Sequence, residues 1–255
     1  EVTRETVDAV LKALPRGALR LADIRESDPL VKLLAAHVLR PYPNPLRQLG
    51  PDAPADTGSN RRFQVRVPGY ARRLAEQGRV EHEMVDFDTR RPEALALLDE
   101  FWQIHDLRHA GRRNAWKDPS NRAFLREYIE QSERSDVLAF VLKFNGRPVA
   151  FDLGFRAGSR FLLYIPAFHP DYDRFRPGHV NRFYSFPKCR EMGLDIYDFS
   201  RGDSFAKRVW STGEEWSVIL TNSRLLAWID ELKILGRRWG LNQRVGRWLE
   251  RLRRR

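Results

Sequence analysis

The stretch VLAFVLKFNGRPVAFDLGFRAGSRFLLYIPAF, residues 137–168, decides the fold. It contains three runs typical of strands: Val137–Phe144, Pro148–Arg156 and Arg160–Phe168. The pairs Asn145-Gly146 and Ala157-Gly158 separate these runs, and Asn-Gly is the pair that two-residue hairpin turns favour. The stretch therefore predicts an antiparallel meander.

Helices and further strands flank the meander on both sides. After it we expect a polar loop (Asp171–Pro177), a helix from Gly178 to Met192 closed by Gly193, a strand (Asp195–Phe199), a short helix (Ser204–Trp210) and a strand (Trp216–Thr221). Before it we expect a strand (Arg79–Phe87), a helix (Pro92–His109) and a helix that Asp118-Pro119 opens and that ends near Glu133. This order indicates an α/β fold built on a mixed sheet.

The first third of the chain has a less regular pattern. Val7, Val10, Leu11 and Leu14 fall on one helical face, and Ala18–Ile24 is typical of a strand. Asp28-Pro29 predicts the start of a helix through Leu39, followed by a loop over Pro41–Ser59. An arginine-rich helix is expected within Asn60–Gln77, and Pro68-Gly69 should break or kink it.

Composition places the chain among ordinary globular proteins. Of its 255 residues 42% are hydrophobic and 31% are charged, and no uncharged apolar run approaches the roughly 20 residues that cross a bilayer. The one cysteine, Cys189, cannot form an internal disulfide and is read as a small buried residue. We therefore expect a cytoplasmic protein.

The positive charge is concentrated at the end of the chain. Residues 233–255 hold nine basic residues and one acidic residue, so they carry +8 of the net +11. Val245, Trp248, Leu249 and Leu252 form an apolar stripe there, with arginines on the other side. Such a helix can lie on an anionic membrane, which would place the protein at the inner membrane face, or it can dock on the protein body.

A candidate anion site lies ahead of the helix that begins near Gly178. The segment Arg174-Phe-Arg-Pro-Gly-His-Val180 places two arginines and a glycine at a helix entry, where backbone N–H groups and the helix dipole favour a phosphate. By local chemistry alone, Pro-Gly before a helix is also compatible with a simple turn.

Several motifs in fixed order resemble one enzyme family. They are Gly146-Arg-Pro-Val-Ala150, Phe168-His-Pro-Asp-Tyr172, Arg176-Pro-Gly-His179, Gly193-Leu-Asp-Ile-Tyr-Asp-Phe-Ser-Arg-Gly-Asp203 and Lys207–Trp210. This arrangement is similar to the CelD-like GNAT acetyltransferases linked to polysaccharide biosynthesis, which are related to Fem-type peptidyl transferases. The resemblance covers roughly residues 60–221.

The resemblance implies an architecture and a donor substrate. Residues 86–222 would be a complete GNAT copy, residues 1–85 a partial first copy and residues 223–255 a helical tail. Acyl-CoA or acetyl-CoA would lie between splayed strands, with its pyrophosphate on the backbone at Arg176–Val180. The residues expected to bind this donor are Arg174, Arg176, Pro177, Gly178, His179, Val180 and Lys207.

Acyl transfer to an amine needs a base, oxyanion donors and an acid for the leaving thiolate. Asp198 and Asp203 flank Gly202 near the end of a predicted strand and are candidate bases, although each is also compatible with a cap or an arginine pair. Tyr164 is a candidate acid or a core aromatic, and Lys207 a phosphate ligand or a solvated charge.

The histidines offer a further source for the base. His105 and His109 share a helical face, and His169 and His179 lie near the proposed anion site. Spacing of i and i+4 also suits zinc, but no third ligand is evident, so no metal is expected.

The sequence thus predicts an N-acyltransferase that moves an acyl group from acyl-CoA to an amine acceptor, for example an amino sugar or another envelope precursor. Two alternatives remain open at this point. One is a Fem-like transferase that uses aminoacyl-tRNA, with the arginine-rich helix and the tail on the RNA. The other is a non-catalytic GNAT-like adaptor for membranes or nucleic acid.

Overall fold

A computed structural model describes residues 5, 20–33, 37–54, 58–111, 114–221, 223–224, 227–231 and 234. The chain divides into two compact units, residues 45–213 and residues 1–44 together with 214–255. The N-terminal helical face at Val7–Leu14 and the basic tail at 233–255, apart from Ile234, lie outside the described residues. No helix among the described residues has both the length and the hydropathy to cross a bilayer.

The larger unit is built on a mixed sheet with strand order β2-β7-β6-β5-β4-β3. Its strands are the last residues of β2 (His37–Gln48), β3 (Val80–Asp86), β4 (Val137–Phe144), β5 (Arg147–Ala157), β6 (Arg160–Phe168) and β7 (Ile196–Asp198). Its helices are α3 (Gly58–Gln64), α4 (Val67–Ala75), α5 (Arg91–Arg108), α6 (Pro119–Gln131), α7 (Pro177–Glu191) and α8 (Phe205–Arg208), with 3₁₀ turns η1 (Ala115–Lys117) and η2 (Pro170–Phe175). The predicted meander is confirmed, because β3 to β6 pair in antiparallel order.

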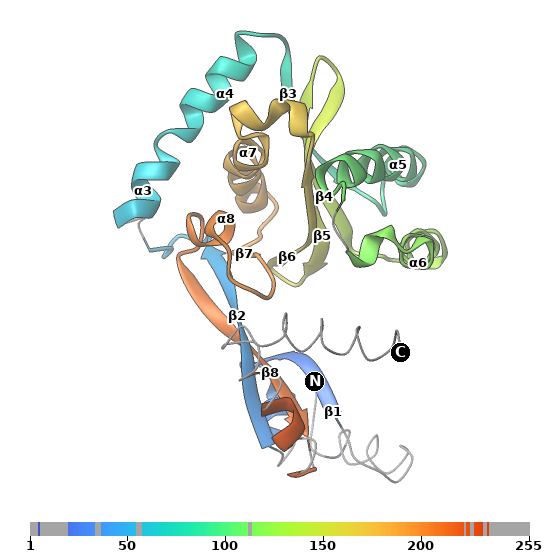
Figure 1. Cartoon of the computed structure of the whole chain (residues 1–255), viewed down its shortest axis with the longest axis vertical. Coiled ribbons are helices and arrows are strands. Elements are labelled where there is room, and N and C mark those ends of the chain that lie inside the picture. Colours follow the sequence, from blue (N-terminus) through green and yellow to red (C-terminus); the bar gives the residue numbers. More distant parts are fainter. Residues whose placement is uncertain are drawn as a thin grey trace, which may run out of the picture. The chain divides into compact units, whose positions relative to one another are not determined.

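Helices cover both faces of this sheet, α5 and α6 on one side and α4 and α7 on the other (Figure 1). Strand β4 contributes to both cores: Phe140 packs with Phe161 and Tyr197, and Val141 lies in the core of Phe101 and Phe151. This explains why residues 137–142 are apolar without alternation. Burial of each large side chain stabilises the fold by about 1.5–3 kcal/mol.

The local signals in the sequence act as expected at the element ends. Asn145 and Gly146 adopt φ values of 51° and 77°, as a type I′ turn requires. The carboxylate of Asp118 accepts the Ser120 N–H and caps α6. Gly193 adopts φ 70° after the end of α7, which is the left-handed conformation of a helix C′ residue.

The arginine-rich segment forms two helices rather than one. Helix α3 ends at Gln64 and α4 begins at Val67, with Pro68 in its first turn. A proline ring clashes with the carbonyl four residues earlier and donates no hydrogen bond, so a continuous helix through this point is unfavourable. The predicted break is confirmed.

The smaller unit contains β1 (Arg20–Arg25), α2 (Pro29–Leu33), the first part of β2 and most of β8 (Gly213–Thr221). Strand β1 pairs antiparallel with β8, and Val218 and Leu220 form a small core with Leu21 and Ile24. The predicted helix through Leu39 and loop over 41–59 are wrong, because α2 ends at Leu33 and β2 runs to Gln48. Prolines 41, 43 and 45 alternate along β2, so all their missing N–H groups fall on one side of the strand.

The domain boundary expected at 85/86 falls inside the larger unit. It cuts strand β3 before its last residue, and β3 pairs with β4 along its whole length, from Val80 to Asp86. The derivation of residues 1–85 from a first copy stays a prediction.

A bulge in β6 shapes the centre of the sheet. Leu153 pairs with Ile165 while the next residue, Gly154, pairs with Leu163, so Tyr164 is the extra residue. A Cβ at Gly154 would overlap the Leu162 carbonyl and lie 2.7 Å from the Phe161 ring. Only glycine therefore allows β5 and β6 to approach this closely at the bulge.

We predict that Gly154→Ala lowers the free energy of unfolding by about 3 kcal/mol through overpacking at the bulge. Urea denaturation measures the change. Gly69→Ala is the matched control: its Cβ would meet nothing within 4 Å in α4, so the protein should keep its stability or gain about 0.5–1 kcal/mol. Equal effects of the two substitutions would show that the close approach does not constrain the bulge.

Candidate functional site

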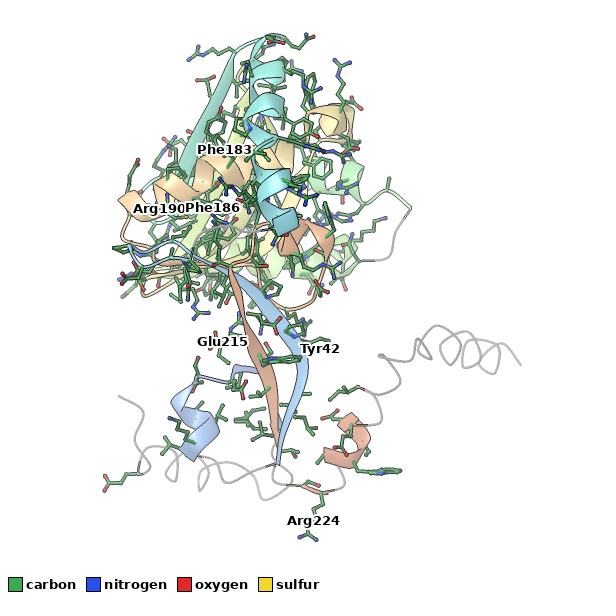
Figure 2. All side chains as sticks on the ribbon, turned by 90° about the vertical axis from the view of Figure 1, so that its left-hand side faces the viewer. Tyr42, Phe183, Phe186, Arg190, Glu215 and Arg224 are labelled. Atoms are coloured by element: carbon green, nitrogen blue, oxygen red, sulfur yellow. The ribbon has the colours of Figure 1, made fainter. Side chains whose placement is uncertain are left out.

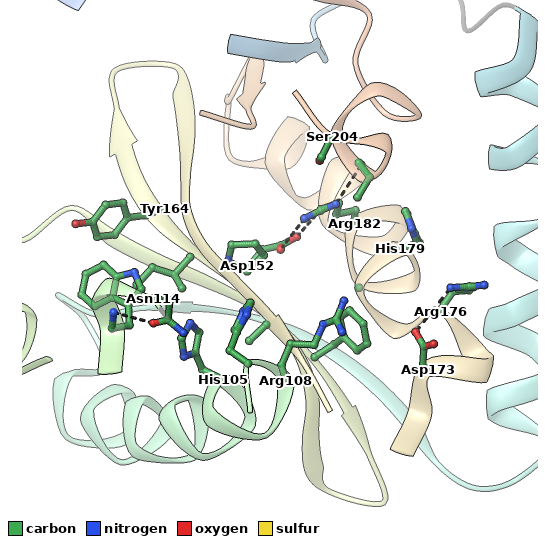
Figure 3. Close-up of a pocket in the computed structure, with 18 of the residues that line it drawn as sticks. His105, Arg108, Asn114, Asp152, Tyr164, Asp173, Arg176, His179, Arg182 and Ser204 are labelled. Carbon is green, nitrogen blue, oxygen red and sulfur yellow. Dashed lines mark hydrogen bonds and ion pairs between the residues drawn. The ribbon is translucent and has the colours of Figure 1, made fainter. Parts of the chain in front are cut away.

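A cavity of about 650 Å³ opens at the middle of the larger unit. Its lining comes from the end of α5, the segment at η1, strands β5 and β6, the start of α7 and the start of α8 (Figure 3). The lining side chains that the following paragraphs use are His105, Arg108, Asn114, Trp116, Asp152, Tyr164, Phe168, Arg176, Gly178, His179 and Arg182.

The cavity lies where two parallel strands part. Strand β7 pairs with β6 only over Arg160–Leu162, and β6 continues to Phe168 without it. The bulge at Tyr164 lies two residues after Leu162, the last β6 residue that pairs with β7. A bulge bends the strand that contains it. The edge of β6 beyond Leu162 therefore faces the cavity with backbone groups that β7 does not use.

Helix α7 begins at this opening. Arg176 precedes it in the left-handed conformation, with φ 51° and ψ 49°, which is uncommon for arginine and turns the chain from η2 into the helix. Gly178 lines the cavity, and a Cβ there would meet only the Phe168 ring, at 3.5 Å. The packing of the described residues thus leaves room for a ligand to approach the Gly178 N–H, while the N–H groups of His179 and Val180 donate to the Arg176 carbonyl.

His179 presents a defined hydrogen-bond donor. The Trp210 indole donates to its Nδ1 at 2.9 Å, so the proton of the neutral ring is on Nε2. Burial, together with the positive charges of Arg182 and Arg176, lowers the pKa of His179 to about 3. The ring is therefore neutral at physiological pH and can donate from Nε2.

A buried ion pair forms the floor of the cavity. Arg182 contacts Asp152 through Nε and NH2 at 3.2 and 3.4 Å, and the Tyr197 hydroxyl donates to Asp152 at 2.8 Å. Burial raises the pKa of Asp152, whereas the guanidinium and the hydroxyl favour its charged form. With these donors in place we assign the pair as ionised; the carboxylate raises the pKa of Arg182.

His105 is a cavity histidine without a hydrogen-bond partner on Nδ1. Its side chain is 3% exposed, and the nearest carboxylate oxygen, on Asp106, lies 4.0 Å from Nδ1. Burial and the neighbouring His109 lower the pKa of His105 to about 4. A neutral, buried imidazole with an unused ring nitrogen can accept a proton or bind a polar group of a ligand.

An aromatic wall lies beside these histidines. Trp116 packs edge-on against Tyr164 at 5.3 Å between ring centroids and stacks on Trp102 at 5.5 Å. Tyr164 is 49% exposed although it is a large aromatic, so it faces the cavity rather than the core. Figure 3 shows it on the same side as His105 and Asn114, away from α7.

The structure brings only some of the predicted site residues together. Arg176, Gly178, His179 and Tyr164 line the cavity. Pro177 and Val180 are buried in α7, and the guanidinium of Arg174 lies 4.6 Å from the Phe175 ring centroid. These three side chains are not part of the lining.

The two predicted acidic bases and Lys207 already have protein partners. Asp198 is fully buried, pairs with Arg160 at 2.9 Å and accepts the Ser200 N–H at 2.7 Å. Asp203 pairs with Arg208 at 2.8 Å. Lys207 donates to the carbonyls of Ser200 and Arg201; burial, and next Arg182, lower its pKa to about 8.

Asp152 and Arg182 are site residues that the sequence did not reveal. Asp152 lies within an apolar run and Arg182 within a helix, 30 residues apart, so no local spacing links them. The charge inside an apolar strand was the only available signal.

Sequence profiles agree with this geometry. The profile described as the acetyltransferase (GNAT) domain matches residues 61–208, more than half of the chain. The chain belongs to this acetyltransferase family. The GNAT fold accounts for the mixed sheet, the parted strands and the helix that follows them. The comparison with curated protein sequences found no match.

Solved structures share the fold at low sequence identity. The C-terminal domain of a lysylphosphatidylglycerol synthetase from Agrobacterium fabrum matches with a TM-score of 0.60 and 14% identity, over 91% of this chain and 75% of that one. L-PGS from Bacillus licheniformis matches with 0.57 and 12%, over 91% and 77%. FemX matches with 0.53 and 14%, over 89% and 79%. At these identities the similarity concerns the fold alone.

We predict that His179 makes stability depend on pH. The unfolded ring protonates near pH 6.5 and the folded ring only near 3, so the unfolded state binds more protons between these values and stability falls as the pH drops. Between pH 7 and 5 the wild type should lose about 2 kcal/mol more than His179→Gln does. Urea denaturation at both pH values measures this, and equal losses would contradict the assignment.

Proposed function

We propose that this protein is an N-acyltransferase that moves an acyl group from acyl-CoA, such as acetyl-CoA, to an amine. The observation that carries the proposal is the opening between β6 and β7. The N-terminus of α7 and Gly178 lie at its mouth. An elongated donor with a diphosphate at one end and a thioester at the other suits this arrangement.

The α7 entry supplies the groups for the diphosphate. The Gly178 N–H and the helix dipole favour negative charge, and Nε2–H of His179 adds a neutral donor; the backbone N–H groups of His179 and Val180 donate to the Arg176 carbonyl. The Arg176 guanidinium lines the same mouth and is paired only loosely, 3.7 Å from Asp173. These groups can donate hydrogen bonds to a diphosphate, which would compete with Asp173, also in the lining, for Arg176.

The unused edge of β6 would hold the rest of the donor. The Leu163 carbonyl accepts the Ser200 hydroxyl, and the backbone groups beyond it can pair with amide groups of an extended chain in place of β7. This places the thioester deeper in the cavity, toward α5. The described wall there includes His105, His109, Asn114, Trp116 and Tyr164.

We assign the base to His105, rather than to Asp198 or Asp203, which have arginine partners and do not line the cavity. The amine nitrogen attacks the thioester carbonyl carbon, the new C–N bond forms and the C–S bond breaks. His105 takes the proton that the nitrogen releases, which becomes acidic as the C–N bond forms. The Tyr164 hydroxyl can supply a proton to the leaving thiolate.

The acceptor side favours a polar ring-shaped amine. Exposed aromatic faces at Tyr164 and Trp116, beside the polar groups of Asn114 and Arg108, suit a hydroxylated ring such as an amino sugar. This agrees with the envelope or polysaccharide precursor that the sequence resemblance implies.

Gly178→Trp should weaken acetyl-CoA binding at least tenfold, because the indole would fill the space in front of the α7 N–H groups. Isothermal calorimetry measures the Kd. Gly69→Trp places the same side chain on α4, where a Cβ meets open space, and should bind like wild type. Unchanged affinity of a folded Gly178→Trp protein would refute the diphosphate site.

His105→Gln should lower kcat by roughly 10²–10⁴-fold while the Kd for acetyl-CoA stays unchanged. The assay follows release of the CoA thiol with glucosamine as the trial acceptor, and added imidazole should restore part of the rate. His109→Gln, at the residue that follows α5, changes the other histidine of the cavity lining and should lose less than tenfold. A His105→Gln rate within tenfold of wild type would remove His105 from the mechanism.

A further inference from the structure

A second hollow lies on the other side of α7 from the cavity. It measures about 600 Å³ and shares no lining residue with the first. Its lining is formed by Arg47, Arg61, Gln64, Val65, Pro68, Phe183, Phe186, Pro187, Arg190 and Trp210. Figure 2 faces this side of the larger unit, with Phe183, Phe186 and Arg190 labelled along α7.

Arginine is the only charged residue type in this lining. Arg47 lies over the Phe186 ring at 4.9 Å and donates to the Trp210 carbonyl, and Arg190 donates through Nε to the Leu49 carbonyl. These contacts hold two guanidinium groups in place at the wall of the hollow. Among the residues that the structure describes, no carboxylate lines it.

The charge continues along α3 and α4. A third hollow shares Val65 and Pro68 with the second hollow. It adds Arg66, Arg72 and Arg73 and contains one acidic residue, Glu76. We name the two hollows together the arginine groove. Its arginines between Arg61 and Arg73 lie on α3, on α4 and at the junction between the two helices.

The arginines of the groove differ from those on the opposite helices. Near α5 and α6, Arg122, Arg126 and Arg134 pair with the carboxylates of Asp106, Asp99 and Asp136. Within the described part of the chain, Arg61, Arg66, Arg72 and Arg73 form no ion pair. Unpaired like charges repel one another, so their concentration on a concave surface calls for an anionic ligand.

We propose that the arginine groove binds a phosphodiester strand of nucleic acid. Arginine forks bind phosphate oxygens in pairs, and successive arginines along α3 and α4 can meet successive phosphates of one strand. The partly exposed Phe183 ring gives a base a surface on which to stack. A concave, elongated groove fits a strand better than it fits the plane of a membrane.

This site goes beyond the proposed acyl transfer and does not depend on it. The groove and the cavity lie on different faces of α7. Arg61, Arg66 and Arg72 are exposed, and they line the arginine groove but not the cavity. Changing them should leave acetyl-CoA binding as it is.

The test compares two triple variants of the full chain by fluorescence anisotropy with a labelled 20-nucleotide oligouridylate and the matching DNA strand. Arg61→Gln with Arg66→Gln and Arg72→Gln removes three groove charges. Lys117→Gln with Arg147→Gln and Arg156→Gln removes three exposed charges elsewhere, and both variants keep the basic tail.

At 0.1 M KCl the groove triple should bind RNA at least tenfold more weakly, and its slope of log K against log salt should shrink by about 2, that is about 0.7 for each lost phosphate contact. The control triple should stay within about twofold of wild type. Equal binding of RNA and DNA, or a preference for RNA, supports the proposal.

Three results would overturn it. The first is equal loss in both triples, which would indicate net charge alone. The second is wild-type binding in the groove triple or no saturable binding at all. The third is loss of binding to phosphatidylglycerol vesicles with RNA binding intact, which would assign the groove to a membrane.

Discussion

The larger unit depends on one close approach, that of Gly154 on β5 to the Leu162 carbonyl on β6. It permits the bulge at Tyr164, which bends β6, and β6 leaves β7 after three paired residues. The strands part on one side only, because on the other side β3, β4 and β5 stay paired, with one bulge at Val149. Without this interruption the cavity would be closed by ordinary strand pairing.

Helix α7 lies against the interruption and organises both sides of it. Its first turn faces the mouth of the cavity, Arg182 reaches the buried Asp152, and Phe183, Phe186 and Arg190 face the arginine groove. Trp210 connects the two regions, since it lines the groove and donates to His179 at the mouth. Helix α7 therefore contributes to the walls of both the cavity and the arginine groove.

Local signals in the sequence predicted most of this unit. Asn145-Gly146, Asp118-Pro119 and Gly193 each have a turn or cap chemistry that acts within a few residues, and Gly178 was found through the same kind of signal. Strand β2 was missed because its prolines suggested a loop. Their spacing of two residues places the missing N–H groups on one side of the strand, and only the sheet shows that this is compatible with strand pairing. His105 was one of four histidines in the sequence argument, and only the fold shows which one is buried in the cavity without a partner.

The buried pair of Asp152 and Arg182 has a consequence for how the site can change over time. Replacing either residue alone leaves the other as an isolated charge among Phe199, Tyr197 and other apolar neighbours, which costs about 3–5 kcal/mol. That is a large fraction of the total stability of a domain. The two positions are therefore expected to vary together or not at all. A relative with a different floor of the cavity, for example one for another acceptor, would need substitutions at both positions.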